Sequence, residues 1–245
     1  MALALNAASW TLEALGEEAV LLRLGARIDP QLNREVHALA ARIDAIRPPW
    51  LHDIVPAYAA LALFVDPAHA QARDRLALDL VGDWLARLAE EAGTAARADV
   101  TAVEIPVCYD RACAPDLDAV ARQAGIAADE VVARHSAGDY TVAMIGFAPG
   151  FPYLLGLDPV LATPRHATPR VRVPAGSVGI GGSQTGIYPG DSPGGWQLIG
   201  RTPRRLFDPH RDPPSLLRPG QPVRFVAVTL AEYRRLDPGA VVAHG

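Results

Sequence analysis

The residues best suited to chemistry are arginines within residues 144–208, a segment rich in glycine, proline and aromatic side chains. Two Thr-Pro-Arg units present Arg165 and Arg170, and Arg172 and Arg201 follow them. Proline stiffens the chain, and guanidinium groups fork onto carboxylates and phosphoryl groups. We therefore predict that these four arginines hold a small anionic ligand, and an arginine-rich solvated surface is the alternative.

One histidine is a candidate proton carrier. His135 stands at the end of an expected helix, before a turn at Gly138 and a strand that begins at Tyr140. A histidine titrates at a pH of about 6.5, which suits general acid–base work. A capping or surface position is the alternative for an isolated histidine of this kind.

Two glycine motifs of this segment fail as well-known catalytic or nucleotide-binding loops. Residues 190–194 match G-x-S-x-G, but Pro193 follows Ser192 and has no N–H for an oxyanion hole. Residues 179–186 lack both the G-x-G-x-x-G spacing and a lysine, so they predict neither a Rossmann nor a Walker loop. Their backbone N–H groups can still face an anion. No histidine pair has metal-ligand spacing, so no metal site is predicted.

Composition restricts the class of protein. The 245 residues carry a net charge of −4, and all 23 basic residues are arginine. Residues 140–235 alone carry a net charge of +6, yet they have no lysine runs, and no nucleic-acid partner is expected. No apolar run reaches about 18 residues, and the start of the chain is not basic, so we expect no membrane span and a cytoplasmic protein. Cys108 and Cys113 are expected to stay reduced.

The first hundred residues alternate strand and helix patterns. Asp29-Pro30 and Asp66-Pro67 are helix-start signals, and each precedes apolar residues at helical spacing. The order β-α-β-β-α-β predicts a ferredoxin-like, split βαβ domain, with a further strand around residues 9–14. The expected strands are 19–24, 51–55, 58–65 and 101–107, and the expected helices begin at Asp29-Pro30 and Asp66-Pro67.

The pattern changes after Tyr109. Two short helices are expected at residues 115–124 and 128–134, followed by short strands separated by Pro-Gly, Gly-Gly and Thr-Pro turns, the last at 223–229. Many short strands with frequent turns predict a closed β-barrel. We therefore expect an α+β protein with domains at residues 1–97 and 98–245.

Several long motifs resemble those of the 5-oxoprolinase B-subunit family, also known as the allophanate hydrolase subunit 1 or KipI-like family. In the second half these are GFAPGFPYL, PRVRVPAGSVGI, QTGIYPGDSPGGWQLIGRTP and LFDP. In the first half, IVPAYAALALFVDP and EIPVCYD also match. The resemblance spans nearly the whole chain. It implies an N-terminal α/β domain followed by a cyclophilin-like β-barrel.

The resemblance also implies a function. It indicates one component of a bacterial ATP-dependent 5-oxoprolinase, inactive alone, which opens pyroglutamate to glutamate together with the C and A subunits of that enzyme. ATP would serve the complex, and whether this chain binds it stays open. Two alternatives are a histidine-kinase inhibitor and a component of a urea- or allophanate-metabolising amidohydrolase. A homodimer is a further option for the chain alone.

Site roles follow from combining this chemistry with the residues. Arginines and turn N–H groups stabilise anionic charge, and aromatic side chains shape a pocket. The predicted catalytic residues are His135, Arg170 and Gln184. The predicted substrate-binding residues are Phe147, Phe151, Arg165, Arg172, Thr185, Tyr188, Trp196 and Arg201.

Overall fold

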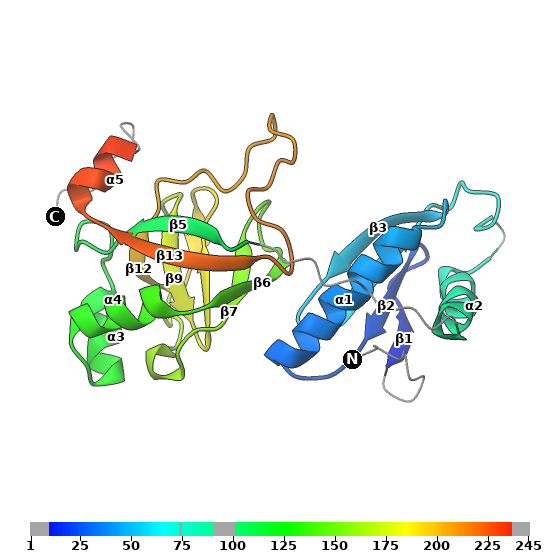
Figure 1. Ribbon diagram of the computed structural model, residues 1–245, viewed down its shortest axis with the longest axis horizontal. Coiled ribbons are helices and arrows are strands. Elements are labelled where there is room, and N and C mark those ends of the chain that lie inside the picture. Colours follow the sequence, from blue (N-terminus) through cyan, green and yellow to red (C-terminus); the bar gives the residue numbers. More distant parts are fainter. Residues whose placement is uncertain (1–9, 74, 91–100, 237–245) are drawn as a thin grey trace. The chain divides into compact units, whose positions relative to one another are not determined.

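The chain folds into two compact units, Met1–Asp99 and Val100–Gly245, in the computed structural model (Figure 1). The structure describes residues 10–73, 75–90 and 101–236. The predicted boundary between residues 97 and 98 lies outside these described residues. None of the helices in the described part of the chain has the length and apolarity needed to span a lipid bilayer.

The first unit is a four-stranded antiparallel sheet with two helices. Its strand order is β1-β2-β4-β3. Helix α1 begins where the sequence predicts, because the Asp29 carboxylate accepts hydrogen bonds from the N–H groups of Gln31 and Leu32 at 2.8 and 2.9 Å. The elements are β1 (Thr11–Ala14), β2 (Ala19–Arg23), α1 (Pro30–Ile46), β3 (Leu51–Pro56), β4 (Ala60–Val65) and α2 (Ala77–Glu90).

Both helices cover the same face of this sheet. Alternate strand residues such as Val20 and Leu22 of β2 and Leu61 and Leu63 of β4 point to that face and are buried. Residues of α1 and α2, among them Val36, join the same apolar cluster. The two-residue period of the strands and the helical spacing in the sequence therefore create one core.

The strand expected at residues 101–107 does not belong to this sheet. Val103–Cys108 (β5) lies in the second unit, and β1, paired with β2, takes the sheet's fourth position. The β1–β2 hairpin needs only a short loop, whereas a strand beginning at residue 103 would have to close a much longer one, which costs more conformational entropy. Strands β2 and β3 still enclose β4, as in a split βαβ motif, but the complete ferredoxin-like arrangement is not confirmed.

The second helix also begins later than predicted. Asp66 starts a turn instead, with its carboxylate accepting from the N–H of Ala68 at 2.9 Å and its carbonyl accepting from the N–H of His69. Helix α2 begins at Ala77. The Asp-Pro signal was therefore a turn signal, because the local bonds of Asp66 can close a turn as well as cap a helix.

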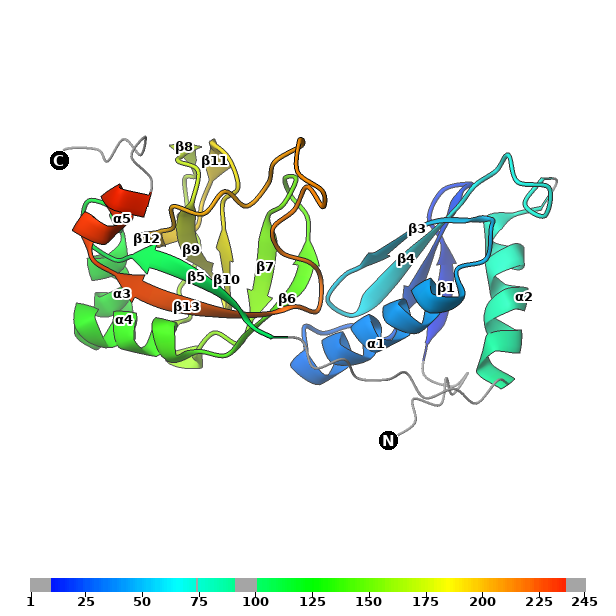
Figure 2. The same cartoon turned by 45° about the horizontal axis from the view of Figure 1, so that its top comes forward.

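The second unit contains a closed seven-stranded β-barrel, as predicted. Its strand order is β10-β7-β6-β13-β5-β12-β9, and β5 and β13 are parallel. A separate ribbon of β8 and β11 stands at one end of the barrel, away from α3 and α4 (Figure 2). The strands are β5, β6 (Tyr140–Ile145), β7 (Pro152–Leu155), β8 (Arg170–Val173), β9 (Ser177–Gly181), β10 (Gln184–Ile187), β11 (Ser192–Gly194), β12 (Gln197–Arg201) and β13 (Pro222–Val228). The helices are α3 (Leu117–Ala124), α4 (Ala128–Ala137), the short 3₁₀ helix η1 (Pro159–Leu161) and α5 (Leu230–Leu236).

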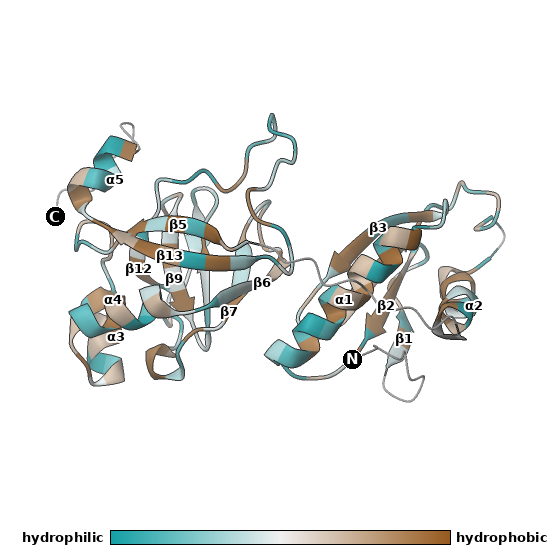
Figure 3. Cartoon of the chain, viewed as in Figure 1, coloured by the Kyte–Doolittle hydropathy of each residue, from teal (hydrophilic) through white to brown (hydrophobic). Residues whose placement is uncertain are grey.

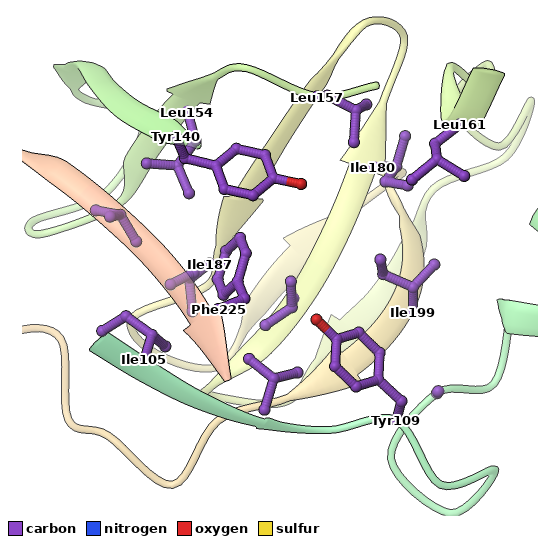
Figure 4. Packing of buried hydrophobic residues seen from close by; sticks show 14 of the residues in the cluster. Ile105, Tyr109, Tyr140, Leu154, Leu157, Leu161, Ile180, Ile187, Ile199 and Phe225 are labelled. Carbon is purple, nitrogen blue, oxygen red and sulfur yellow. The ribbon is translucent and has the colours of Figure 1, made fainter. Parts of the chain in front are cut away.

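The barrel interior is filled by side chains. Along β13, Val223 and Phe225 are buried and Arg224 is exposed. Figure 3 shows both hydrophobic and hydrophilic segments along this strand. Tyr109 and Tyr140 point their hydroxyl groups into the same interior (Figure 4). The barrel is thus a packed core and not a pore, so a ligand site has to be sought elsewhere on this unit.

Candidate functional site

Glycines on strands β9 and β10 create a flat outer face on the barrel. Because neighbouring residues such as Ile180 point inward, Gly181 and Gly186 point outward. A Cβ added at Gly181 would lie 2.5 Å from the Trp196 ring. One added at Gly186 would lie 2.7 Å from the Pro152 carbonyl oxygen and 3.1 Å from the Phe151 ring. The glycines therefore let aromatic rings lie directly against the strand backbone.

Four aromatic side chains gather on this face, and we name them the aromatic platform: Phe151, Tyr153, Tyr188 and Trp196. The Phe151 ring centroid lies 5.2 Å from that of Tyr188 and 5.6 Å from that of Trp196, in edge-on geometry. Tyr153 contacts Trp196 in the same manner at 5.8 Å. Edge-on contacts of this kind are the favoured geometry of aromatic pairs. The platform is therefore a well-packed apolar cluster, in which Phe151, Tyr188 and Trp196 are buried and Tyr153 is partly buried.

Phe147 extends the platform into solvent. Its ring centroid lies 5.4 Å from that of Phe151, and the residue is 64% exposed. Its φ of +69° is uncommon for a residue with a side chain. The turn that holds it is closed by a hydrogen bond from the Gly146 N–H to the Phe151 carbonyl at 3.1 Å. A bulky exposed side chain in a strained backbone conformation is often found at functional sites.

A guanidinium group lies over the platform. The Arg165 guanidinium carbon is 5.6 Å from the centroid of the Trp196 ring, which is cation–π geometry. Burial raises the pKa of the Tyr153 and Tyr188 hydroxyls, and the positive charge of Arg165 acts against that rise in both. Within the part of the chain that the structure describes, the Arg165 side chain has no hydrogen bond or ion pair. Its N–H donors are therefore available to an anion.

A second cluster, the Asp116 cluster, consists of Asp116, His166 and Arg170. The buried Asp116 carboxylate accepts from Arg170 Nη2 at 2.6 Å and from the backbone N–H of Leu198 at 2.6 Å. His166 Nε2 lies 3.3 Å from Asp116 Oδ2, the same oxygen that accepts from the Leu198 N–H. Asp116 precedes helix α3 but makes no capping bond with its side chain. The carboxylate instead fixes the loop that leads into β8.

The four predicted arginines have different partners. Arg170 is bound to Asp116, and the exposed Arg172 pairs with Asp191 at 2.6 Å. Arg201 donates through Nε to the Ala175 carbonyl at 2.9 Å. Only Arg165 is joined to the aromatic platform. The structure therefore does not show four arginines around one anion.

The structure places His135 inside the barrel, with no exposed surface. Its Nδ1 lies 2.7 Å from the Tyr109 hydroxyl, and its Nε2 lies 3.0 Å from Thr185 Oγ1. Because Thr185 gives its single proton to the Gly179 carbonyl, His135 Nε2 must donate and Nδ1 must accept. Burial lowers the pKa of His135 to about 3. Both nitrogens are thus engaged, and this geometry argues against the predicted proton carrier.

Two more predicted residues lie on β10. Thr185 is inside the barrel with His135, and Gln184 is buried at the start of the strand.

Asp116 was not predicted as a site residue, because its contacts with His166 and Arg170 cross 50 and 54 positions of sequence and leave no local pattern. Within the described residues, no three His, Cys, Asp or Glu side chains lie together in a way that could hold a metal ion.

Comparisons with known proteins agree with this architecture. The chain matches the family of the carboxyltransferase domain, subdomain C and D, over residues 10–217. It is 42% identical to the 5-oxoprolinase B subunit of Bacillus subtilis (strain 168) over 238 residues, which cover 91% of this chain and 95% of that protein. The chain therefore belongs to the 5-oxoprolinase B-subunit family.

A second relative and a solved structure extend the comparison. The chain is 44% identical to the 5-oxoprolinase B subunit of Escherichia coli O157:H7 over 212 residues, covering 86% of this chain and 93% of that protein. The crystal structure of TTHA0988 superposes with a TM-score of 0.72 at 42% identity over 86% of this chain. The match covers 40% of TTHA0988, so this chain corresponds to less than half of that longer protein.

Proposed function

We propose that this chain is one component of an ATP-dependent 5-oxoprolinase complex, which hydrolyses 5-oxo-L-proline to L-glutamate. The observation that carries the proposal is identity of 42% and 44%, over nearly full length, with two proteins named as the B subunit of 5-oxoprolinase. At that identity and coverage a shared role is the simplest account, and the platform chemistry supports it. The alternatives of a kinase inhibitor or a urea-metabolising component have no comparable support.

The proposed substrate suits the aromatic platform. 5-Oxoproline has an apolar five-membered ring, a lactam and a carboxylate. The exposed ring of Phe147, which packs edge-on against the buried Tyr188, offers an apolar contact for the five-membered ring. Arg165 offers two parallel N–H donors to the carboxylate. We propose Phe147 and Arg165 as substrate contacts. His135 and Thr185 are buried inside the barrel, and we do not propose that they contact the substrate.

ATP and the other components complete the proposal. The chain has no Walker or Rossmann loop, so we assign ATP to the complex and propose the C and A subunits of 5-oxoprolinase as partners. We also propose that the chain alone is inactive, because the platform offers a cation and apolar rings but no activated nucleophile. A reaction that consumes ATP fits a cytoplasmic location, and the closed barrel fits the cyclophilin-like class.

A reconstitution experiment tests the proposal. The purified chain is mixed with the A and C subunits, ATP and 5-oxoproline, and glutamate and ADP are measured in the full mixture and in mixtures that lack one component. We expect glutamate only when this chain and ATP are both present. Equal glutamate without this chain would refute the proposal, and inhibition of a histidine kinase with no hydrolysis would support a regulatory role instead.

A further inference from the structure

We propose that His166 is the proton carrier beside the aromatic platform and that Asp116 is the residue that orients it. The inference rests on the proposed function, because it assigns a role within the hydrolytic step. It transfers to His166 a role that the sequence suggested for His135. Four observations support it: the position of His166, its orientation, its exposure and the charges around it.

His166 lies at the edge of the platform. Its backbone N–H donates to the Gly195 carbonyl at 2.7 Å, and Gly195 directly precedes Trp196. The preceding residue, Arg165, stacks on the Trp196 ring. The His166 side chain is 30% exposed, whereas His135 has no exposed surface. Of these two histidines, only His166 can therefore exchange protons with a ligand on the platform.

The Asp116 carboxylate determines which nitrogen of His166 carries the proton. Nε2 lies 3.3 Å from Asp116 Oδ2, and a carboxylate accepts but cannot donate. Neutral His166 therefore holds its proton on Nε2 and presents a lone pair on Nδ1. Within the described residues, Nδ1 has no hydrogen-bond partner. A carboxylate that fixes the tautomer of a partly exposed histidine is the arrangement general bases use.

The charged residues that share the Asp116 cluster with His166 are Asp116 and Arg170. Arg170 Nη2 binds Asp116 Oδ1 at 2.6 Å, so a cation already balances the charge of the carboxylate. The second amino group of Arg170, Nη1, is buried and has no hydrogen-bond partner in the described part of the chain. An unpaired buried donor is costly and is usually satisfied by water or a ligand. The Asp116 cluster therefore holds a base atom on His166 and, on Arg170, a buried donor that no described residue uses.

The proton transfer balances in two stages. As the water oxygen bonds to the lactam carbonyl carbon, one water proton passes to His166 Nδ1. As the carbon–nitrogen bond breaks, His166 returns that proton to the ring nitrogen. The sum adds one water across the amide and leaves His166 unchanged, and no oxidant or reductant is needed.

The competing role for His166 is a structural latch that holds the loop on Asp116. His166→Gln separates the two roles, because the glutamine amide can still donate to Asp116 but cannot carry a proton. In the reconstituted complex we expect His166→Gln to lower kcat by about a hundredfold or more. The KM for 5-oxoproline and the thermal midpoint should stay near the wild-type values. The exposed His210 serves as the matched control, and His210→Gln should leave kcat unchanged.

Two results would overturn the proposal. The first is a His166→Gln complex that retains kcat within about threefold while His166→Ala loses stability, because general-base loss costs far more. The second concerns the chain without partners, where ¹⁵N NMR reports the tautomer of each histidine. We expect neutral His166 with its proton on Nε2, and a shift toward Nδ1 in Asp116→Asn. A wild-type chain with the proton on Nδ1 would refute the proposal for His166, whatever the complex releases. A complex that releases no glutamate would instead refute the proposed function, so the two failures can be told apart.

Discussion

Arg165 differs from Arg170 and Arg172 in its partner, because an aromatic ring contacts it where a carboxylate binds each of the others. Arg172 forms an exposed ion pair with Asp191, which is worth about 0–1 kcal/mol. Arg165 rests on the Trp196 ring, a contact worth about 0.5–1 kcal/mol at an exposed site. An anion can therefore engage the N–H donors of Arg165 while the stacking contact remains. Arg170 differs because its Nη2 binds the buried Asp116 carboxylate and its Nη1 is itself buried.

His135 is a packing residue whose ionisation opposes folding. Its imidazole stacks on Phe225 with centroids 4.6 Å apart and joins Tyr109 and Thr185 by hydrogen bonds. Its pKa is about 3 in the folded chain and, as for any exposed histidine, about 6.5 when unfolded. The unfolded chain therefore binds a proton first as the pH falls. The stabilisation is complete above about pH 6.5 and is lost progressively toward pH 3.

His135→Gln tests this residue-scale account. At about pH 7.5 we expect the variant to lower the free energy of unfolding, because an amide cannot reproduce the ring stack. Between pH 6.5 and 5 the wild type loses about 2 kcal/mol from this group and the variant does not, so the difference shrinks by that amount. Peptide-resolved hydrogen exchange on β10 and β13 measures this difference in the free energy of unfolding between wild type and variant. A difference that stays constant from pH 7.5 to 5 would show that His135 does not titrate as described.

At the scale of elements, the glycines of β9 and β10 decide where the aromatic residues can lie. A Gly-rich strand is weak by itself, because glycine adds no side-chain packing and has a high conformational entropy when unfolded. Here the Trp196 ring fills the space that a Cβ atom would take at Gly181, and the Phe151 ring and the Pro152 carbonyl crowd that space at Gly186. The strand and the platform therefore depend on one another.

Gly181→Ala tests that dependence, with Gly190→Ala as the matched control. A Cβ at Gly181 meets the Trp196 ring at 2.5 Å, whereas a Cβ at Gly190 has no neighbour within 4 Å. We expect Gly181→Ala to destabilise the barrel by about 1–3 kcal/mol and to shift the Trp196 indole N–H resonance. Gly190→Ala should change neither. Equal effects of the two substitutions would show that the rings do not rest on the glycine face.

Local patterns predicted most elements but not their partners. The cap at Asp29, the two helices before Tyr140 and the closed barrel followed from spacing and turn residues. The pairing of β5 with β13 did not, because a strand's sequence does not state which sheet it will join. Asp66 misled for a related reason, since an Asp-Pro pair supports both a turn and a helix start.

At the scale of the whole molecule, how well a site residue could be predicted depends on how far its contacts lie from it in the sequence. Phe147, Arg165 and Trp196 come together because one Gly- and Pro-rich segment folds back on the barrel. His135 looked accessible because a helix end is often exposed, and only the barrel around it reveals its burial. Asp116 was missed because its partners are remote in sequence. Composition and motifs therefore pointed to the region that we propose as the site, and the fold decided which of its residues lie together.

The central claim is that this chain's platform holds the carboxylate of 5-oxoproline through Arg165. The most direct test is the KM for 5-oxoproline of complexes assembled with Arg165→Ala or with Arg204→Ala, an exposed arginine of the same unit. Loss of one charge-assisted contact should raise KM about tenfold or more for Arg165→Ala. Arg204→Ala should leave KM within about twofold of the wild-type value, because a solvated surface charge contributes little. An unchanged KM in the Arg165→Ala complex would contradict the account.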